Sequence, residues 1–158
     1  MARIDPNTSG GQNVCAFLDM LAWSEFTSRI AGSDDGYNVV VGGGLFASYA
    51  DHSRKSVWTK RFNVWSTAAG CYPLLSRYFD VHKQQLGLSD FSPVSQDKIA
   101  IQQIRERGAL PDIKAGRIEV AVSKCRNIWA SLPGAGYGQV EHQLEPLLQQ
   151  YVKAGGAM

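Results

Sequence analysis

The sequence has no long uninterrupted run of apolar residues. The segment from Met1 to Asn13 is polar, contains Gly10-Gly11 and lacks the apolar stretch of a secretory signal. No later run approaches the roughly 20 apolar residues that a membrane-spanning helix needs. We therefore expect a chain without an export signal and without membrane insertion, which needs another route for any action outside the cytoplasm.

Residues that bind metals or form disulfides are also scarce. The 158 residues include three histidines and three cysteines, Cys15, Cys71 and Cys125, which are widely spaced. The cysteine number is odd, and no Cys-x-x-Cys or Cys/His pair has zinc-ligand spacing. We predict three free thiols in a reducing compartment, no bound metal and no cofactor.

The motifs of nucleotide-binding enzymes and serine hydrolases are missing. Gly42-Gly43-Gly44 lacks the Lys-Ser/Thr pair of a phosphate loop, and the sequence contains no Gly-x-Ser-x-Gly. The formal net charge is only +2, with acidic and basic residues interspersed. This balance argues against a nucleic-acid partner, although a slightly basic surface suits an anionic polymer.

What the sequence does contain is a series of helix patterns around one short β region. We expect helices at about 13–23, 72–86, 92–107, 111–114 and 117–131, a last helix carrying Leu144 to Val152, and short strands at about 37–41, 45–46 and 57–58. Asn13 and Ser92 are the expected N-caps, and Pro93 is the expected first helical residue. These elements predict an α+β fold in which residues 1–12 are a flexible leader and residues 13–158 form one domain. The domain has a helical body, a small three-stranded antiparallel sheet and a cleft between them.

Glu25 continues the apolar stripe of the first long helix. Phe17, Leu18, Leu21 and Ala22 recur at helical spacing, and Glu25 follows Leu21 by one further turn. Burial would raise the pKa of the Glu25 carboxyl, because the charged form loses its water. A carboxylic acid that stays protonated near neutral pH can act as a general acid. The alternative is that Glu25 is solvated where the stripe ends.

Asp34 is the candidate for a second carboxylate. A helix, a loop and a sheet in this order can place Glu25 and Asp34 across a cleft, and a carboxylate pair is the usual apparatus of glycosidases. The alternative is that Gly32-Ser33-Asp34-Asp35-Gly36 is an ordinary turn, in which Asp bonds its own backbone. Several aromatic residues in or beside the predicted loops suit stacking on sugars: Trp23, Tyr37, Trp58, Trp65, Tyr72 and Tyr137.

Several segments resemble the bacteriophage lambda endolysin family. The most specific is Asn127 to Gln139, with the sequence Asn-Ile-Trp-Ala-Ser-Leu-Pro-Gly-Ala-Gly-Tyr-Gly-Gln, and another is Ala16 to Glu25, with Ala-Phe-Leu-Asp-Met-Leu-Ala-Trp-Ser-Glu. The other similar stretches occur in the family's order and are Gly36-Tyr37, Val41-Gly42-Gly43, Leu74 to Arg77, Gln85 to Leu88, Asp90 to Pro93, Gln102 to Ile104 and Arg107 to Pro111. Together they extend over about Ala16 to Gly156.

This resemblance implies a lysozyme-like fold and a lytic transglycosylase that cleaves the MurNAc–GlcNAc bond of peptidoglycan. The family's catalytic Glu falls on Glu25, and the family has no second catalytic carboxylate, so Asp34 loses its role. The two loops that flank the family's groove fall on residues 58–70 and 132–143. The implied substrate-binding residues come from these loops or lie next to Glu25 or the first loop, and they are Ser24, Ser66, Thr67, Tyr72, Tyr137 and Gln139.

The resemblance also implies a phage endolysin that lyses the host cell. Such a protein accumulates in the host cytoplasm and reaches the periplasmic cell wall after a holin has breached the inner membrane. The implied partner is the glycan strand of peptidoglycan, and we expect a monomer. The implied product is a 1,6-anhydro sugar, formed when the 6-hydroxyl of MurNAc attacks its own C1.

Three residues depart from the family pattern. Phe26 stands where family members often have Gly, and Cys71 and Pro73 replace an Arg and a Gln near the groove. These departures bear on loop geometry and substrate affinity. Two alternatives to a transglycosylase remain open: a hydrolysing lysozyme (muramidase) that uses Glu25 with Asp34, and a cell-wall-binding homologue with an inactive site.

Overall fold

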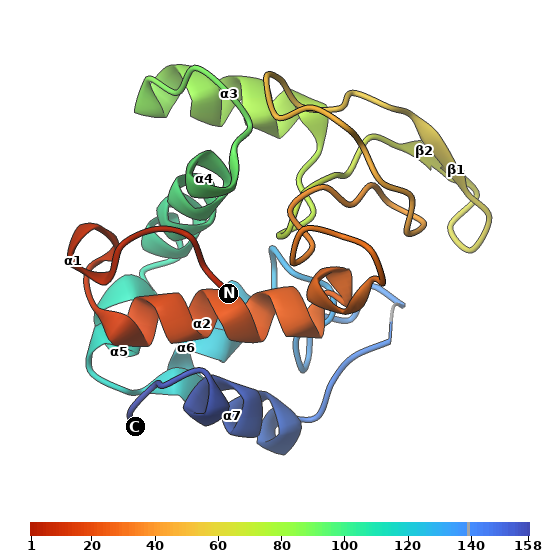
Figure 1. Cartoon of the computed structure of the whole chain (residues 1–158). Coiled ribbons are helices and arrows are strands. Elements are labelled where there is room, and N and C mark those ends of the chain that lie inside the picture. The colour runs from red at the N-terminus through yellow and green to blue at the C-terminus, as the bar shows by residue number, and fades with distance from the viewer. Residues whose placement is uncertain (139) are drawn as a thin grey trace.

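The computed structural model describes residues 1–138 and 140–158, and within them it shows a helical body with a small β lobe (Figure 1). The helices are α1 (Pro6–Ser9), α2 (Gln12–Ser24), the 3-10 turn η1 (Thr27–Arg29), α3 (Ser76–Leu86), α4 (Pro93–Glu106), α5 (Leu110–Lys114), α6 (Ile118–Cys125) and α7 (Leu144–Lys153). The strands are β1 (Val57–Thr59) and β2 (Val64–Ser66). None of the described helices has the length and apolarity to cross a membrane. The predicted α+β class is confirmed.

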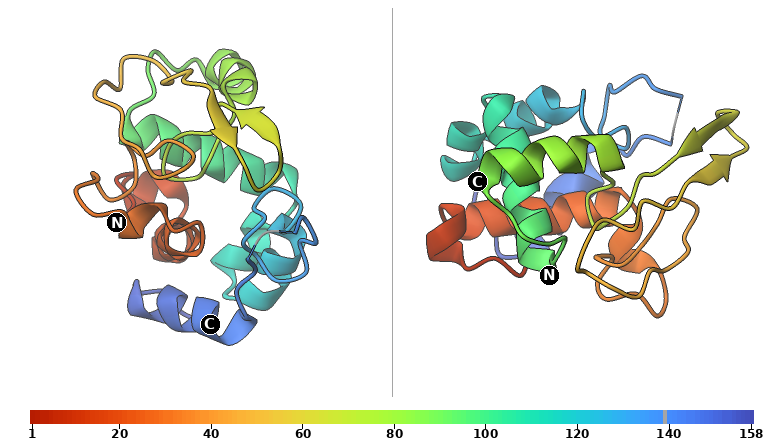
Figure 2. Two further views of the ribbon diagram at one scale, coloured as in Figure 1. Left: turned by 90° about the vertical axis from the view of Figure 1, so that its right-hand side faces the viewer. Right: turned by 90° about the horizontal axis from the view of Figure 1, so that it is seen from above.

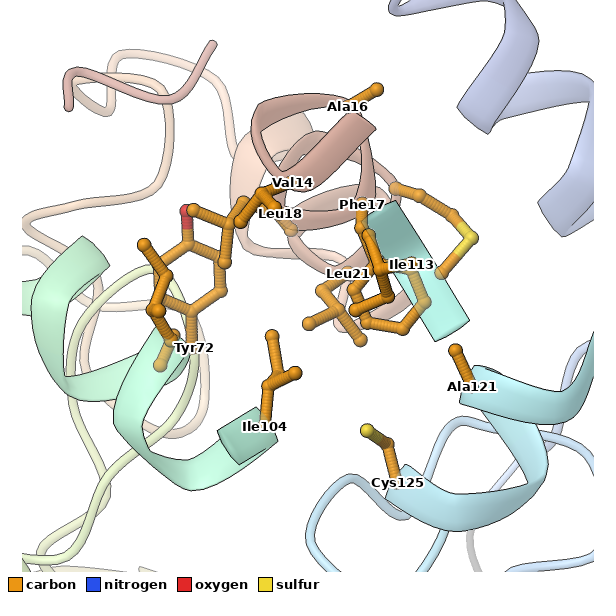
Figure 3. Packing of buried hydrophobic residues seen from close by; sticks show 14 of the residues in the cluster. Val14, Ala16, Phe17, Leu18, Leu21, Tyr72, Ile104, Ile113, Ala121 and Cys125 are labelled. Atoms are coloured by element: carbon orange, nitrogen blue, oxygen red, sulfur yellow. The ribbon is translucent and has the colours of Figure 1, made fainter. Parts of the chain in front are cut away.

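Helix α2 forms the centre of the main core. The side chains of Phe17, Leu18 and Leu21 are fully buried, as their spacing predicted. Figure 3 shows them on the side of α2 that faces α4, α5 and α6, while Ala16 points to the other side. Helix α7 packs against α2 as well (Figure 1). Helix α2 is thus packed on both sides, and this packing fixes the position of its C-terminal end in the helical body.

Several element boundaries differ from the prediction. The N-cap of α2 is Gly11 and not the predicted Asn13, which lies inside the helix. The side-chain amide of Asn13 instead donates to Ile113 O at 3.2 Å and to Ala157 O at 3.1 Å. Helix α3 begins at Ser76 and not near residue 72, because Ala69 and Leu74 exchange two backbone hydrogen bonds that hold the intervening residues in a turn. The predicted helix 117–131 ends at Cys125, although Trp129 beyond it is buried as expected.

The prediction for α4 is confirmed at its N-terminus. Pro93 is the first helical residue, and the Ser92 hydroxyl accepts a hydrogen bond from the Ser95 amide at 3.4 Å. A proline in the first turn costs no hydrogen bond, since that amide has no partner within the helix.

The sheet has two strands and not the predicted three. Strands β1 and β2 are antiparallel and pair Val57 with Ser66, Trp58 with Trp65, and Thr59 with Val64. The segment 37–46 contributes only isolated bridges, because Gly42 and Gly43 adopt positive φ angles and reverse the chain after residue 41. Strand β2 lies in a region that was expected to be a loop.

The first twelve residues make more contacts than a flexible leader would. Ile4 is part of the main core, and the amides of Arg3 and Ile4 each donate to Asp97 Oδ2 at 2.8 Å. The same carboxylate also accepts hydrogen bonds from the hydroxyls of Tyr37 and Tyr72. The sequence does not reveal this docking, because Asp97 lies in a helix far away along the chain.

The β lobe has its own small core. It is made of the buried residues Val40, Ala69, Leu74, Phe79, Phe91 and Ile99. This second cluster fixes the lobe on α3 and α4, with the β1–β2 hairpin projecting at its edge (Figure 2). The two cores are the reason that a groove can exist between body and lobe.

Candidate active site

Glu25 lies at the end of α2, where the helical body meets the β lobe. Its amide donates to Leu21 O at 2.8 Å, so the residue is held by the last turn of the helix. The side chain is partly buried and lines a groove of about 470 Å³. A second hollow of about 280 Å³ adjoins the first, and Glu25, Phe26 and Phe62 line both. The carboxyl is therefore placed where a long ligand could pass from one hollow into the other.

Two serines form a hydrogen-bonded chain that ends on the Glu25 carboxyl. The Ser131 hydroxyl donates to Glu25 Oε1 at 2.6 Å, and Ser24 Oγ lies 2.5 Å from Ser131 Oγ. Burial raises the pKa of Glu25 above its ordinary value, while the hydrogen bonds from Ser131 lower it by a smaller amount. The net result favours a protonated acid, which is what a general acid requires. Sequence reasoning missed Ser131, although it lies inside the segment with the strongest resemblance.

Substitution of Ser131 should therefore shift the pH dependence of any reaction that needs protonated Glu25. In Ser131→Ala, the ionised carboxylate loses a hydrogen bond, so the pKa of Glu25 rises further. Activity that is lost on the alkaline side should then persist to higher pH than in the wild type. Activity on peptidoglycan (murein), the substrate that the family resemblance implies, checks this when measured from pH 4 to 9, with Ser33→Ala as the control variant. A shift of the alkaline limb to lower pH would contradict the role of Ser131.

Phe26, which lines both hollows, packs against other side chains at the end of α2. The His142 ring lies 4.7 Å from the Trp23 ring and 5.4 Å from the Phe26 ring, and the Arg29 guanidinium lies 3.9 Å from the centre of Phe26. Phe26 has a φ angle of 65°, a left-handed conformation that glycine adopts at lower cost. The departure from Gly at this position thus places an aromatic ring in the wall of both hollows.

The predicted substrate-binding residues do not all reach the groove. Ser66 lines the larger hollow and Ser24 the smaller one. The Thr67 hydroxyl accepts a hydrogen bond from the Ser76 amide at 3.0 Å, which ties it to the start of α3. Tyr137 is exposed and its hydroxyl donates to Asn127 O, away from both hollows. Gln139 lies outside the described residues.

Tyr72, which was predicted to contact substrate, does not line either hollow. The residue is buried, and its hydroxyl donates to Asp97 Oδ1 at 2.8 Å in the interior. Neighbouring Cys71 is also buried, whereas Pro73 lines the larger hollow. Cys71 and Pro73 are the two residues beside Tyr72 that depart from the family pattern. Only Pro73 lies in the groove wall, where it makes the wall more apolar.

Asp34 is engaged in contacts away from the groove. Arg3 Nη2 donates to Asp34 Oδ1 at 2.6 Å, and the Tyr49 hydroxyl donates to Oδ2 at 2.7 Å. These partners hold the pKa of Asp34 below its ordinary value. Among the described residues that line either hollow, Glu25 is the only one with an acidic side chain. The structure does not bring Glu25 and Asp34 together across the cleft.

Two loops meet at one end of the groove. The Arg61 guanidinium, at the tip of the β1–β2 hairpin, donates to Gly138 O in the loop that follows Trp129. Glu141 orders that loop by accepting hydrogen bonds from the amides of Gly134 and Gly136 at 2.9 and 2.7 Å. In the part of the chain that is described, no cluster of His, Cys, Asp and Glu could hold a metal ion. The site is thus a partly covered groove with one acid.

Comparison with known proteins gives a consistent result. The endolysin family model matches residues 15–158. The endolysin of Escherichia phage lambda is 57% identical over 145 residues, covering 90% of this chain and 91% of that protein. The endolysin of Escherichia phage P2 is 52% identical over 155 residues, covering 92% of this chain and 94% of that protein.

Solved structures agree with the sequence comparison. Bacteriophage lambda lysozyme in complex with a chitohexasaccharide superimposes with a TM-score of 0.89 at 52% identity and covers 100% of this chain and 99% of its own. A second structure of lysozyme from bacteriophage lambda has a TM-score of 0.85 at 51% identity, with the same coverage. The lysozyme-like fold is confirmed, and the chain belongs to the endolysin family.

Proposed function

We propose that the chain is a lytic transglycosylase that cleaves the MurNAc–GlcNAc bond of peptidoglycan during host cell lysis. The observation that carries the proposal is a partly buried acid with a raised pKa in a groove that no second carboxylate lines among the described residues. A hydrolase of the two-carboxylate type needs a base or nucleophile on the opposite face of the sugar. Asp34 does not line the groove, so a muramidase that uses Glu25 with Asp34 has no geometric support.

Glu25 supplies both proton transfers in the proposed reaction. The protonated acid donates to the glycosidic oxygen as the bond to C1 breaks, and the departing GlcNAc keeps that proton as its 4-hydroxyl. Positive charge develops at C1 of MurNAc and is stabilised by the sugar's own N-acetyl group. Ionised Glu25 then removes the proton from the MurNAc 6-hydroxyl as that oxygen attacks C1. The acid is regenerated, and the product carries a 1,6-anhydro ring.

The ring-closing step suits a partly covered groove. The 6-hydroxyl is held next to C1 within the same sugar, so its effective concentration exceeds that of water by orders of magnitude. The contact of Arg61 with Gly138 and the apolar wall residues Phe26, Phe62 and Pro73 restrict the access of bulk water to Glu25. The solved complex of a relative with a chitohexasaccharide supports a glycan ligand.

The masses of the murein fragments test the proposal. We expect every new MurNAc end that the wild type produces to be an anhydro end, one water lighter than a reducing end. Asp34→Asn should leave both the rate and the product unchanged, because Asp34 is engaged with Arg3 and Tyr49. Reducing ends from the wild type, or loss of cleavage in Asp34→Asn, would favour a muramidase instead.

The route to the cell wall is part of the same proposal. We propose that the protein accumulates as a monomer in the host cytoplasm and reaches the periplasmic wall once a holin has permeabilised the inner membrane. Expression in the cytoplasm should then leave cells intact until their inner membrane is breached by chloroform. Spontaneous lysis without such a treatment would contradict this route.

A further inference from the structure

The outer face of the β1–β2 hairpin carries two exposed tryptophans that the groove does not use. Trp58 and Trp65 are directly opposite each other in the sheet, so both side chains lie on the same face. The alternating residues Thr59, Val64 and Ser66 line the groove. Because successive side chains point to opposite faces of a strand, the tryptophan pair lies on the face that is turned away from Glu25.

The pair is large, apolar and exposed. Trp58 is 43% exposed and Trp65 67% exposed, and their ring centres are 5.4 Å apart at an angle of 63°. Two neighbouring exposed tryptophans on a projecting hairpin form an unusual patch for a protein surface in water. Figure 2 shows that this hairpin extends beyond the helical body.

The charge of the hairpin has one sign. Residues 55–66 include Lys55, Lys60 and Arg61 and contain no acidic residue. Both lysines are exposed, and neither makes an ion pair within the described residues. A positively charged segment with adjacent indole rings is complementary to the headgroup region of an anionic bilayer, which is both polar and negatively charged. The indoles favour the headgroup region, and the cations are attracted to the lipid phosphates.

We propose that the outer face of this hairpin, defined by Trp58 and Trp65, binds the surface of an anionic phospholipid bilayer, with positive charge supplied by Lys55 and Lys60, which precede and follow β1 in the sequence. The protein lies on the bilayer through this face and does not cross it. The groove remains free, because its lining residues belong to the opposite face of the same two strands. The proposal does not depend on the reaction that Glu25 performs.

The competing partner is a glycan strand, for which the hairpin face would be a second binding site. The geometry of the two indole rings does not favour sugar binding. A sugar stacks on the flat face of a ring, but the two indoles meet edge to face, so each pair member partly covers the other. Sugar sites are also concave and contain polar groups that fix the ligand's orientation. Neither tryptophan lines either of the hollows beside Glu25.

Flotation of the full-length protein with lipid vesicles tests the proposal. Vesicles of phosphatidylcholine with 30% phosphatidylglycerol should carry the wild type, and pure phosphatidylcholine vesicles should carry far less. Trp58→Thr/Trp65→Thr should abolish the binding, with threonine chosen because it retains strand propensity. Lys55→Gln/Lys60→Gln should lower the partition coefficient for anionic vesicles by roughly 10- to 30-fold. Raising the salt concentration should weaken binding of the wild type.

Matched variants elsewhere on the surface provide the controls. Tyr78→Ser removes an exposed aromatic from α3, and Lys98→Gln/Lys153→Gln removes two exposed lysines from α4 and α7. Both should bind vesicles like the wild type and retain its thermal unfolding midpoint, and all variants should retain murein digestion. Equal binding to neutral and anionic vesicles, or wild-type binding by the tryptophan variant, would overturn the proposal. Selective loss of binding to purified sacculi, with vesicle binding intact, would assign the face to glycan instead.

Discussion

Glu25→Gln is expected to reduce murein cleavage by at least roughly a thousandfold, since general acid–base catalysis by one residue contributes about 10²–10⁴ and Glu25 serves both steps of the proposed reaction. Glutamine has the same shape and can still accept the hydrogen bond from the Ser131 hydroxyl. It cannot protonate the glycosidic oxygen or take a proton from the 6-hydroxyl. Release of soluble muropeptides from purified sacculi measures the effect.

The same substitution should not weaken the fold. Burial raises the pKa of Glu25, so at neutral pH the folded state disfavours the charged form more than the unfolded state does. A neutral glutamine removes that penalty, and the thermal unfolding midpoint should stay equal or rise. This combination of lost activity and retained stability separates a catalytic acid from a structural one.

A matched substitution completes the test. Glu119→Gln changes an exposed residue at the start of α6 and should retain full activity. Substantial cleavage by Glu25→Gln would refute the proposed role of Glu25. If the wild type binds sacculi without releasing muropeptides, the protein is instead an inactive cell-wall-binding homologue.

The sequence was most informative where the signal is local. The stripe from Phe17 to Leu21 predicted the buried faces of α2, and Ser92-Pro93 predicted the start of α4, because helical periodicity and capping depend only on residues a few positions apart. The position of Glu25 beside the groove follows from the same periodicity, as it is one turn beyond the last buried position of its face.

The sequence was least informative where contacts join distant segments. The β region was misjudged because Gly42 and Gly43 reverse the chain after a run that reads as a strand. Ser131 reaches Glu25 from more than a hundred positions away, and no periodicity links the two residues. Tyr72 was assigned to the groove because it is aromatic, lies beside a predicted loop and falls in the family resemblance, whereas its hydroxyl donates to Asp97.

Loss of the Asp97 carboxylate should strongly destabilise the protein. Its buried carboxylate accepts four hydrogen bonds, from the amides of Arg3 and Ile4 and from the hydroxyls of Tyr37 and Tyr72, each at 2.8 Å. Asp97→Ala leaves these donors without a partner and creates a cavity, at a cost of about 3–5 kcal/mol. For a domain of this size, the unfolding midpoint should fall by roughly 6–20 °C. Asp80→Asn, at an exposed carboxylate, should leave the midpoint nearly unchanged.

The Asp97 contacts also connect the fold to the groove. Tyr37 precedes the wall residues Val39 to Gly43, and Tyr72 precedes the wall residue Pro73. The neighbouring side chain of Gln96 adds hydrogen bonds to the Cys71 amide and to Tyr37 O. Residues 96 and 97 of α4 therefore connect three segments: the N-terminal segment, the chain at Tyr37 and the chain at residues 71–72. The last two segments lead directly into walls of the groove.

Asp97→Asn separates these two functions of the carboxylate. Its one remaining oxygen can accept from the two tyrosine hydroxyls, while its amide group then faces the Arg3 and Ile4 amides, which are also donors. We expect a smaller loss of stability than in Asp97→Ala, with faster hydrogen exchange confined to the first twelve residues and murein cleavage retained. Exchange that increases equally in residues 37–43 would show that the N-terminal segment and the groove wall respond as one unit. In that case the activity of Asp97→Asn should fall in proportion to its stability, because the wall that faces Glu25 would loosen together with the N-terminal segment.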